Sequence, residues 1–193
     1  MNYLAHLYLS GNNYQIMIGN FIADHLKGKL RNTFDGDFLR GIKLHHTIDA
    51  FTDSHPVVEQ TKARLRNHFH KYTPVIVDVF YDHFLAHNWK KYHDDELKDY
   101  VHNVYLTLDK NSAILPERTN YMLGYMKKEN WLAGYAHFEN LERIFYNMSI
   151  RTKFENNMQD AVVYLKRDYD LMQKEFEVFF EELKLECEKF LRV

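Results

Sequence analysis

The feature that most constrains this fold is the scarcity of residues that interrupt helices. The 193 residues include only three prolines and seven glycines, the residues that most often end helices or form tight turns. Between them, apolar residues recur at steps of three and four, the spacing of a helix with one buried face. The sequence therefore predicts an all-α fold, a single helical-bundle domain over residues 1–193.

The longest periodic segment covers residues 157–191. Its apolar positions alternate in steps of about three and four: Met158, Val162, Leu165, Tyr169, Met172, Phe176, Phe179, Leu183, Cys187 and Phe190. This pattern predicts one continuous helix, about 50 Å long at 1.5 Å per residue. Such a helix is longer than one compact domain of this size requires. We expect it to cross the whole bundle or to pair with a second copy in a homodimer.

Composition argues against several classes of protein. The net charge is −2, whereas a general nucleic-acid binder normally carries a strongly basic face. No segment approaches the roughly twenty uncharged apolar residues of a membrane span. The one cysteine, Cys187, cannot form an internal disulfide, and the first residues do not resemble a secretory signal. We therefore expect a cytoplasmic protein.

Residues 41–53 combine core residues with residue types that bind metals. Three apolar residues there have the spacing of a buried stripe: Leu44, Ile48 and Phe51. His45, Asp49 and Asp53 follow at four-residue steps and therefore share a neighbouring face of the same helix. An imidazole and two carboxylates beside an apolar wall suit a divalent cation. An exposed polar edge with ordinary helix pairs is the alternative interpretation.

The first two predicted helical segments each carry polar residues among apolar ones. His6 lies inside the apolar segment 2–9, and a histidine so placed is more often a satisfied core residue than a ligand. Asn20 and Asp24 are the polar exceptions in a predicted helix over residues 14–26. An isolated buried carboxylate is costly, so Asp24 needs a cation or a hydrogen-bond donor as its partner.

A carboxylate also falls inside the core stripe of the helix predicted for residues 74–89. Taking 100° per residue, Asp82 lies on the same face as Val79 and Ala86. The structural interpretation is that Asp82 forms a buried ion pair or accepts main-chain donors. The functional interpretation is that Asp82 and its neighbour His83 join residues of the other helices around one or two divalent cations.

Several motifs in this order resemble the acyl carrier protein phosphodiesterase family. They are Asn-Tyr-Leu-Ala-His at 2–6, Gly-Asn-Phe-Ile-Ala-Asp at 19–24, Gly-Ile at 41–42, His45, Ile-Asp at 48–49, Thr-Asp at 52–53 and Asp-Val-Phe-Tyr-Asp-His-Phe-Leu at 78–85. Weaker similarities are Asn-Trp-Leu at 130–132 and Met-Ser-Ile-Arg at 148–151. The resemblance implies a divergent helical member of the HD-type metal phosphohydrolases. It also implies a manganese-dependent enzyme, with magnesium or iron as alternatives.

The implied reaction is hydrolysis of the phosphodiester that joins 4′-phosphopantetheine to a serine of holo-acyl carrier protein. The products would be the apo-protein and free 4′-phosphopantetheine. One motif departs from the HD pattern: the doublet reads Asp82-His83 rather than His-Asp. Ligand roles therefore cannot be transferred from HD proteins position by position.

The site hypothesis assigns three kinds of role. The predicted metal ligands are Asp24, His45, Asp49, Asp82 and His83. The predicted catalytic residues are His6, Asp24 and Asp82, with His6 donating a proton to the leaving serine oxygen or supporting a ligand. The residues expected to orient ligands are Asn20, Asp53 and Asp78.

Basic residues are candidates for holding the acidic carrier protein or its phosphate. They are Lys27, Lys29, Arg31, Arg66 and Arg151. Two rival functions remain open at this point. One is hydrolysis of a nucleotide or another small phosphodiester at the same metal site. The other is a non-catalytic helical binding module, in which Asp24 and Asp82 belong to structural ion pairs.

Overall fold

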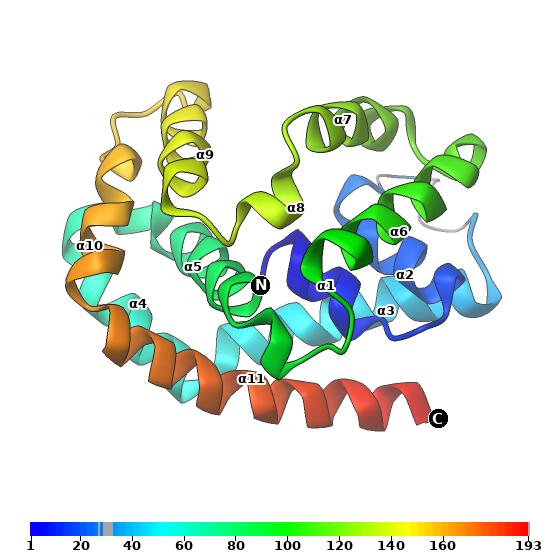
Figure 1. The fold of residues 1–193 in the computed structure, drawn as a ribbon, viewed down its shortest axis with the longest axis horizontal. Helices are drawn as coiled ribbons and strands as arrows, with labels where there is room; N and C mark the ends of the chain where they lie inside the picture. The colour runs from blue at the N-terminus through cyan, green and yellow to red at the C-terminus, as the bar shows by residue number, and fades with distance from the viewer. Residues whose placement is uncertain (27, 29–32, 193) are drawn as a thin grey trace.

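A computed structural model describes residues 1–26, 28 and 33–192, and every regular element among them is helical. The predicted all-α fold is therefore confirmed (Figure 1). The α-helices are α1 (Tyr3–Leu9), α2 (Tyr14–Ile22), α3 (Gly36–Ser54), α4 (Pro56–Phe69), α5 (Thr73–His87), α6 (Leu97–Lys110), α7 (Glu117–Lys128), α8 (Trp131–Gly134), α9 (Phe138–Arg151), α10 (Ala161–Arg167) and α11 (Tyr169–Arg192). None in the described part of the chain is both long and apolar enough to cross a membrane.

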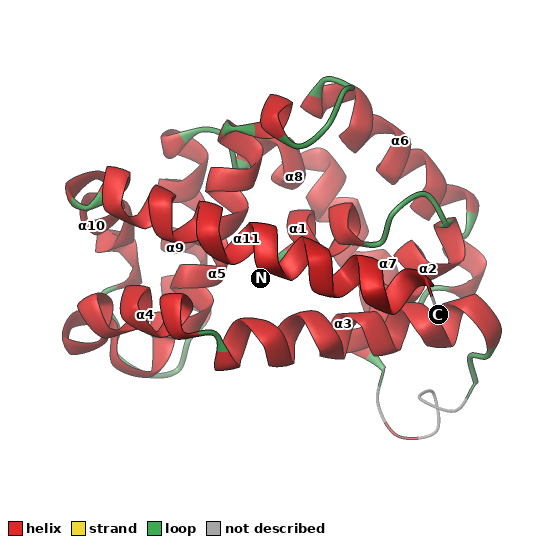
Figure 2. Cartoon of the chain, turned by 90° about the horizontal axis from the view of Figure 1, so that it is seen from below, coloured by secondary structure: helices red, strands yellow, loops and turns green. Residues whose placement is uncertain are grey.

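Helix α5 forms the centre of the core. All but four of its residues are buried, and the rings of Phe84 and Phe176 stack with centroids 5.7 Å apart. Phe176 belongs to α11, which packs along α3, α4 and α5 on one side of the molecule (Figures 1 and 2). Helices α7, α8 and α9 lie on the side away from α11 (Figure 1). Burial of these aromatic faces is the main stabilising term in the fold.

Helices α2 and α3 pack with their backbones in close contact, because each contributes a glycine to the crossing. A Cβ added at Gly41 would overlap the carbonyl oxygen of Ile16 and lie 2.8 Å from the amide nitrogen of Asn20. A Cβ at Gly19 would overlap the carbonyl oxygen of Phe38. A side chain larger than the glycine hydrogen at either position would therefore push the two helices apart. The crossing fixes Asn20 of α2 against the face of α3 that carries His45.

The prediction of one continuous C-terminal helix over residues 157–191 is wrong. A 3₁₀ turn at Met158–Asp160 precedes α10, and α10 ends at Arg167 because Asp168 leaves helical geometry at φ −112° and ψ 24°. The chain turns there before α11 begins at Tyr169 (Figure 1). The turn leaves Leu165 and Met172 both buried, so the apolar periodicity continues across it. Pairing of two copies through this region stays a prediction.

Candidate metal centre

A cavity of about 960 Å³ lies between two groups of helices. One wall comes from α1, α2, α3 and α5, and the other from α7, α8 and α9. His6, Asn20, Asp24, His45 and Asp49 all line the first wall. A space of this size, with several polar groups converging on one side, is typical of a small-molecule or cofactor site.

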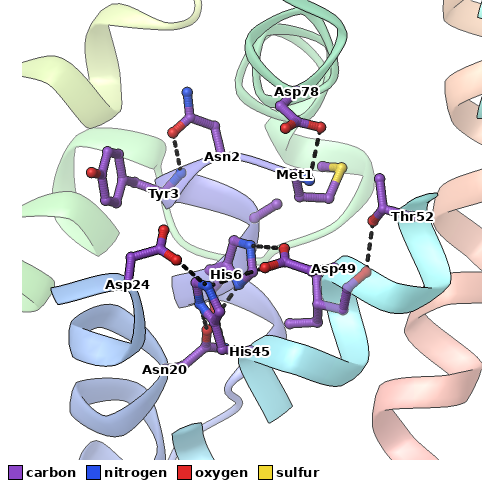
Figure 3. Close-up of polar contacts among 12 residues, drawn as sticks. Met1, Asn2, Tyr3, His6, Asn20, Asp24, His45, Asp49, Thr52 and Asp78 are labelled. Atoms are coloured by element: carbon purple, nitrogen blue, oxygen red, sulfur yellow. Dashed lines mark hydrogen bonds and ion pairs between the residues drawn. The ribbon is translucent and has the colours of Figure 1, made fainter. Parts of the chain in front are cut away.

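Two histidines and two aspartates from three segments meet in this wall: His6 of α1, Asp24 of the turn after α2, and His45 and Asp49 of α3. The rings of His6 and His45 stack with centroids 4.2 Å apart. Asp49 bridges them, since its Oδ1 lies 3.2 Å from His6 Nε2 and its Oδ2 lies 3.2 Å from His45 Nε2. Asp24 Oδ1 is also 3.2 Å from His45 Nε2. Figure 3 shows the two carboxylates on opposite sides of the imidazole pair.

Asn20 fixes which nitrogen of each imidazole faces the carboxylates. Its Nδ2 donates to the carbonyl oxygen of His6 and to Ser10 Oγ, each at 2.9 Å. The amide is therefore held with Oδ1 toward the histidines, 2.8 Å from His6 Nδ1 and 3.1 Å from His45 Nδ1. Because Oδ1 can only accept, both rings donate from Nδ1. When neutral, each ring then presents the lone pair of Nε2 toward Asp49.

This arrangement fits a divalent cation. Ligand atoms of His6, His45 and Asp49 all lie within 4.8 Å of one another, and no other group of three or more such residues meets this criterion among the described residues. The imidazole nitrogens suit borderline cations such as iron or zinc, and the carboxylate oxygens also suit the harder manganese ion. Asn20 supplies the support behind the ligands that metal-binding histidines usually have. Asp24, which is exposed at the cavity, can add a further oxygen.

The electrostatics of the metal-free cluster also favour a positive charge at this point. Burial alone would lower the pKa of His45, but hydrogen bonds to Asp24 and Asp49 raise it to about 9. Burial lowers the pKa of His6. Although burial acts against it, the two imidazoles hold the pKa of Asp49 well below its usual range. The carboxylates are thus ionised. Without a metal, the proton on His45 supplies the positive charge that offsets their negative charge, which a bound cation would otherwise supply.

The prediction that Asp82 is a metal ligand and catalytic residue is wrong. Asp82 is fully buried and does not line the cavity. Its Oδ2 accepts the amide of Leu4 at 2.7 Å, and its Oδ1 accepts those of Asn2 and Ala5 at 3.1 and 3.4 Å. It therefore accepts hydrogen bonds from the amides at the start of α1. The first amides of every helix lack a partner within the helix and need such an acceptor. The structural interpretation, a carboxylate accepting main-chain donors, is the one observed.

His83 also lies outside the metal cluster. Its Nδ1 is 2.8 Å from the carbonyl oxygen of Tyr135, and its Nε2 is 3.2 Å from the hydroxyl of Tyr169. Both ring nitrogens are therefore occupied by partners, which link α5 to the residue that follows α8 and to α11. The prediction that His83 is a metal ligand is wrong, because both ring nitrogens contact other groups and the side chain does not line the cavity.

The residues predicted to orient the ligands separate into two groups. Asn20 contacts both histidines, whereas Asp53 and Asp78 line the cavity without a contact to either. Asp53 Oδ1 pairs with Lys62 Nζ at 2.9 Å, and Asp78 Oδ1 pairs with the α-ammonium group of Met1 at 3.0 Å. The prediction that Asp53 and Asp78 orient the ligands is therefore corrected: each forms a structural ion pair instead.

The predicted basic residues are also dispersed. Arg66 pairs with Glu59 at 2.7 Å on an exposed face of α4 and does not line the cavity, whereas Arg151 of α9 does. Three further candidates, Lys27, Lys29 and Arg31, lie outside the described residues. Arg118 and Arg143 line the cavity but had no signal in the sequence, because single arginines on separate helices form no periodic pattern.

Replacing Asn20 with alanine is expected to weaken Mn²⁺ binding by about 10- to 100-fold, the usual cost of losing a group that orients metal ligands. Both imidazoles would lose the acceptor that fixes their Nδ1–H groups. Isothermal titration calorimetry with MnCl₂ measures the change. Asn147→Ala is the matched control, because Asn147 lines the same cavity and contacts neither histidine. Equal affinities for the two variants would contradict the assigned role of Asn20.

Replacing Asp82 with alanine is expected to lower the free energy of unfolding by about 2 to 3 kcal/mol, because buried main-chain donors lose their acceptor. Urea denaturation measures this change, with Glu59→Ala as the control at the exposed ion pair with Arg66, expected to cost under about 1 kcal/mol. Unchanged stability together with complete loss of Mn²⁺ binding would instead make Asp82 a metal ligand.

Comparison with known proteins gives a consistent result. A family model described as acyl carrier protein phosphodiesterase matches residues 1–183. The acyl carrier protein phosphodiesterase of Pectobacterium atrosepticum is 31% identical over 152 residues, covering 78% of this chain and 79% of that protein. The protein of the same name from Escherichia coli O6:H1 is 29% identical over 184 residues, covering 93% and 94%. No solved structure matches significantly. The chain therefore belongs to the acyl carrier protein phosphodiesterase family and is a phosphoric diester hydrolase.

Proposed function

We propose that this enzyme uses a divalent metal, manganese in the first instance, to hydrolyse the phosphodiester between 4′-phosphopantetheine and a serine of holo-acyl carrier protein. The products are apo-acyl carrier protein and 4′-phosphopantetheine. The single observation that carries the proposal is the convergence of His6, His45 and Asp49, with Asp24 beside them, on one wall of a large cavity. The names of the family and of its relatives supply the substrate.

The residues of the cluster have distinct parts in this proposal. His6 and His45 would hold the cation through Nε2, and Asp49 would hold it through its carboxylate, which contacts both Nε2 atoms. When bound, the cation polarises the phosphoryl group and stabilises the charge that develops during hydrolysis. Asn20 holds both rings in the tautomer that this requires. Asp24, exposed beside His45, is placed to add an oxygen ligand or to accept a proton from attacking water.

The rest of the cavity supports direct attack by water rather than by a side chain. Its described lining contains neither serine nor cysteine. The hydroxyl of Thr52 lines it, but this hydroxyl donates to the carbonyl oxygen of Ile48 at 2.7 Å within α3. A hydroxyl or thiol nucleophile needs an adjacent base that would activate it, and no such pair faces the cavity in the described residues. Hydrolysis in a single displacement therefore accounts best for the residues present.

The size and composition of the opposite wall suit a substrate longer than a phosphate. Apolar and aromatic side chains of α7, α8 and α9 line this wall: Met122, Tyr125, Trp131, Ile144 and Met148. The pantetheine arm is an extended chain of two amides and a thiol. It needs apolar contact along its length and a few polar groups, which this wall provides.

The test is conversion of purified holo-acyl carrier protein to the apo form. A gel-shift assay and mass spectrometry measure this conversion. We expect conversion and release of 4′-phosphopantetheine with MnCl₂, and none after treatment with EDTA. Bis(p-nitrophenyl) phosphate serves as a small phosphodiester for comparison. Turnover of this compound without turnover of the holo-protein would redirect the proposal to a small-molecule substrate. Full activity in EDTA would remove the metal from it.

A further inference from the structure

The two walls of the cavity carry opposite charge. The first wall holds the acidic side chains of Asp24, Asp49, Asp53 and Asp78. The second holds one acid, Glu129, and three arginines: Arg118, Arg143 and Arg151. A phosphodiester is an anion, so the acidic wall alone would repel it. A cation in the metal cluster removes part of this repulsion, and a guanidinium on the opposite wall would bind the oxygens that the cation leaves free.

The three arginines differ in whether their charge is already paired. Arg143 Nη1 lies 3.2 Å from Glu129 Oε2, and its Nη2 donates to Asn140 Oδ1 at 3.3 Å. The side chains of Arg118 and Arg151 make no hydrogen bond or ion pair within the part of the chain that the structure describes. Their guanidinium groups therefore remain available for a ligand, whereas a ligand would have to compete with Glu129 for Arg143.

Arg118 is also the arginine that the fold connects to the metal cluster. It lies one turn before Met122 on α7, on the same helix face. The hydroxyl of Tyr3 donates to Met122 Sδ at 3.1 Å, so this face of α7 meets the start of α1, which carries His6. Burial raises the pKa of Tyr3 to about 12, with Asp24 adding to the rise and Arg118 opposing it. Arg118 and Asp24 thus lie within electrostatic reach of one hydroxyl.

The position of Arg118 within α7 is unfavourable for the helix itself. It is the second residue of α7 and lies in the first turn, where the helix dipole disfavours a positive charge. The preceding Pro116 provides no side-chain cap. An anion bound by Arg118 would therefore also offset the partial positive charge of the N-terminus of α7. Glu117 in the same turn already offsets part of this charge, and a bound anion would add to that compensation.

We propose that Arg118 binds the substrate phosphate from the α7 wall, opposite the metal cluster, and thereby selects ligands whose pantetheine arm carries a phosphate. The identity of the phosphate as part of a carrier-protein phosphodiester rests on the proposed function. Binding of a phosphorylated arm by Arg118 does not depend on turnover and is tested separately.

The experiment compares two probes that differ only in the phosphate: 4′-phosphopantetheine and pantetheine. Calorimetry with the Mn²⁺-loaded protein is expected to show that Arg118→Gln weakens binding of 4′-phosphopantetheine by about 10- to 100-fold, the contribution of a charge-assisted bidentate contact. Binding of pantetheine and of Mn²⁺ should change less than about threefold. Arg118→Lys should retain part of the affinity, because the point charge remains while the bidentate geometry is lost.

Arg143→Gln is the matched control, since Arg143 lines the same cavity but is paired with Glu129. It should change the affinity for 4′-phosphopantetheine less than about threefold. Equal loss in the two variants, equal loss for the two probes, or no binding of 4′-phosphopantetheine to the wild-type protein would each overturn the assignment. Circular dichroism spectra of the variants identify any loss of binding that is due to misfolding. If Arg118→Gln is misfolded, the affinity of Arg118→Lys for 4′-phosphopantetheine decides whether the assignment holds.

Turnover separates this inference from the proposed function. With holo-acyl carrier protein as substrate, Arg118→Gln should raise KM by about tenfold. If the wild-type enzyme does not hydrolyse the holo-protein but loses 4′-phosphopantetheine binding on Arg118→Gln, the proposed function fails and the anion site stands. If it hydrolyses the holo-protein and Arg118→Gln changes neither KM nor binding, the anion site fails and the proposed function stands.

Discussion

Replacing Gly41 with alanine is expected to lower the free energy of unfolding by about 4 kcal/mol or more, near the upper end of what single substitutions do. The new methyl group would overlap the carbonyl oxygen of Ile16 and lie 2.8 Å from the amide nitrogen of Asn20. Both atoms belong to the backbone of α2, so no side chain can move aside to make room. Urea denaturation in EDTA measures the loss, which should appear as a lower midpoint.

The same substitution should also weaken the metal centre. Separation of α2 from α3 would pull Asn20 away from His45, whose Nδ1 lies 3.1 Å from Asn20 Oδ1. Gly124→Ala is the matched control, because a Cβ there meets nothing within 4 Å. Alanine at that helical position should be neutral or stabilise by up to about 1 kcal/mol. Equal stability of Gly41→Ala and the wild-type protein would show that the helix crossing tolerates expansion.

Much of the fold could be predicted from the sequence because helical periodicity reports burial. The expected stripe of Leu44, Ile48 and Phe51 faces the core. The break at Asp168 could not be predicted in the same way. The turn there keeps the buried positions in phase on both sides, so the apolar pattern is the same with and without it.

The candidate site shows a similar division. Short spacings within helices brought Asp24, His45 and Asp49 into one hypothesis, and the structure brings these residues together. The same reasoning failed for Asp82, because periodicity gives the depth of a side chain but not its partner. Its partners are amides of a segment about 80 residues earlier in the chain. Only the tertiary arrangement distinguishes a carboxylate that binds a cation from one that holds a helix N-terminus.

His6 illustrates a further limit of the sequence. A lone histidine in an apolar segment is usually a satisfied core residue, and we predicted it as a proton donor or a support for a ligand. In the structure its Nδ1 is indeed satisfied, by Asn20, but its Nε2 faces Asp49 in the cluster. His6 is therefore both a satisfied core residue and a candidate ligand, since Nδ1 has a buried partner and Nε2 is available to a cation.

Replacing His45 with alanine is expected to abolish measurable Mn²⁺ binding and to lower kcat/KM for holo-acyl carrier protein by about a thousandfold or more. This exceeds the 10- to 100-fold cost of losing a supporting group, because His45 contacts both Asp24 and Asp49 and would itself bind the cation. Metal content by mass spectrometry, calorimetry with MnCl₂ and the holo-to-apo conversion measure the effect. Circular dichroism establishes that the variant is folded.

The adjacent His46 provides the matched control for this prediction. It is exposed and contacts His45 only through the ring edge, with centroids 5.8 Å apart. His46→Ala should therefore retain Mn²⁺ binding and at least about half of the activity, as expected for a surface substitution away from the site. His45→Gln keeps most of the buried volume while removing the imidazole, so it separates lost ligation from lost packing. If His45→Gln retains wild-type Mn²⁺ affinity and turnover, the cluster is structural and the metal mechanism is wrong.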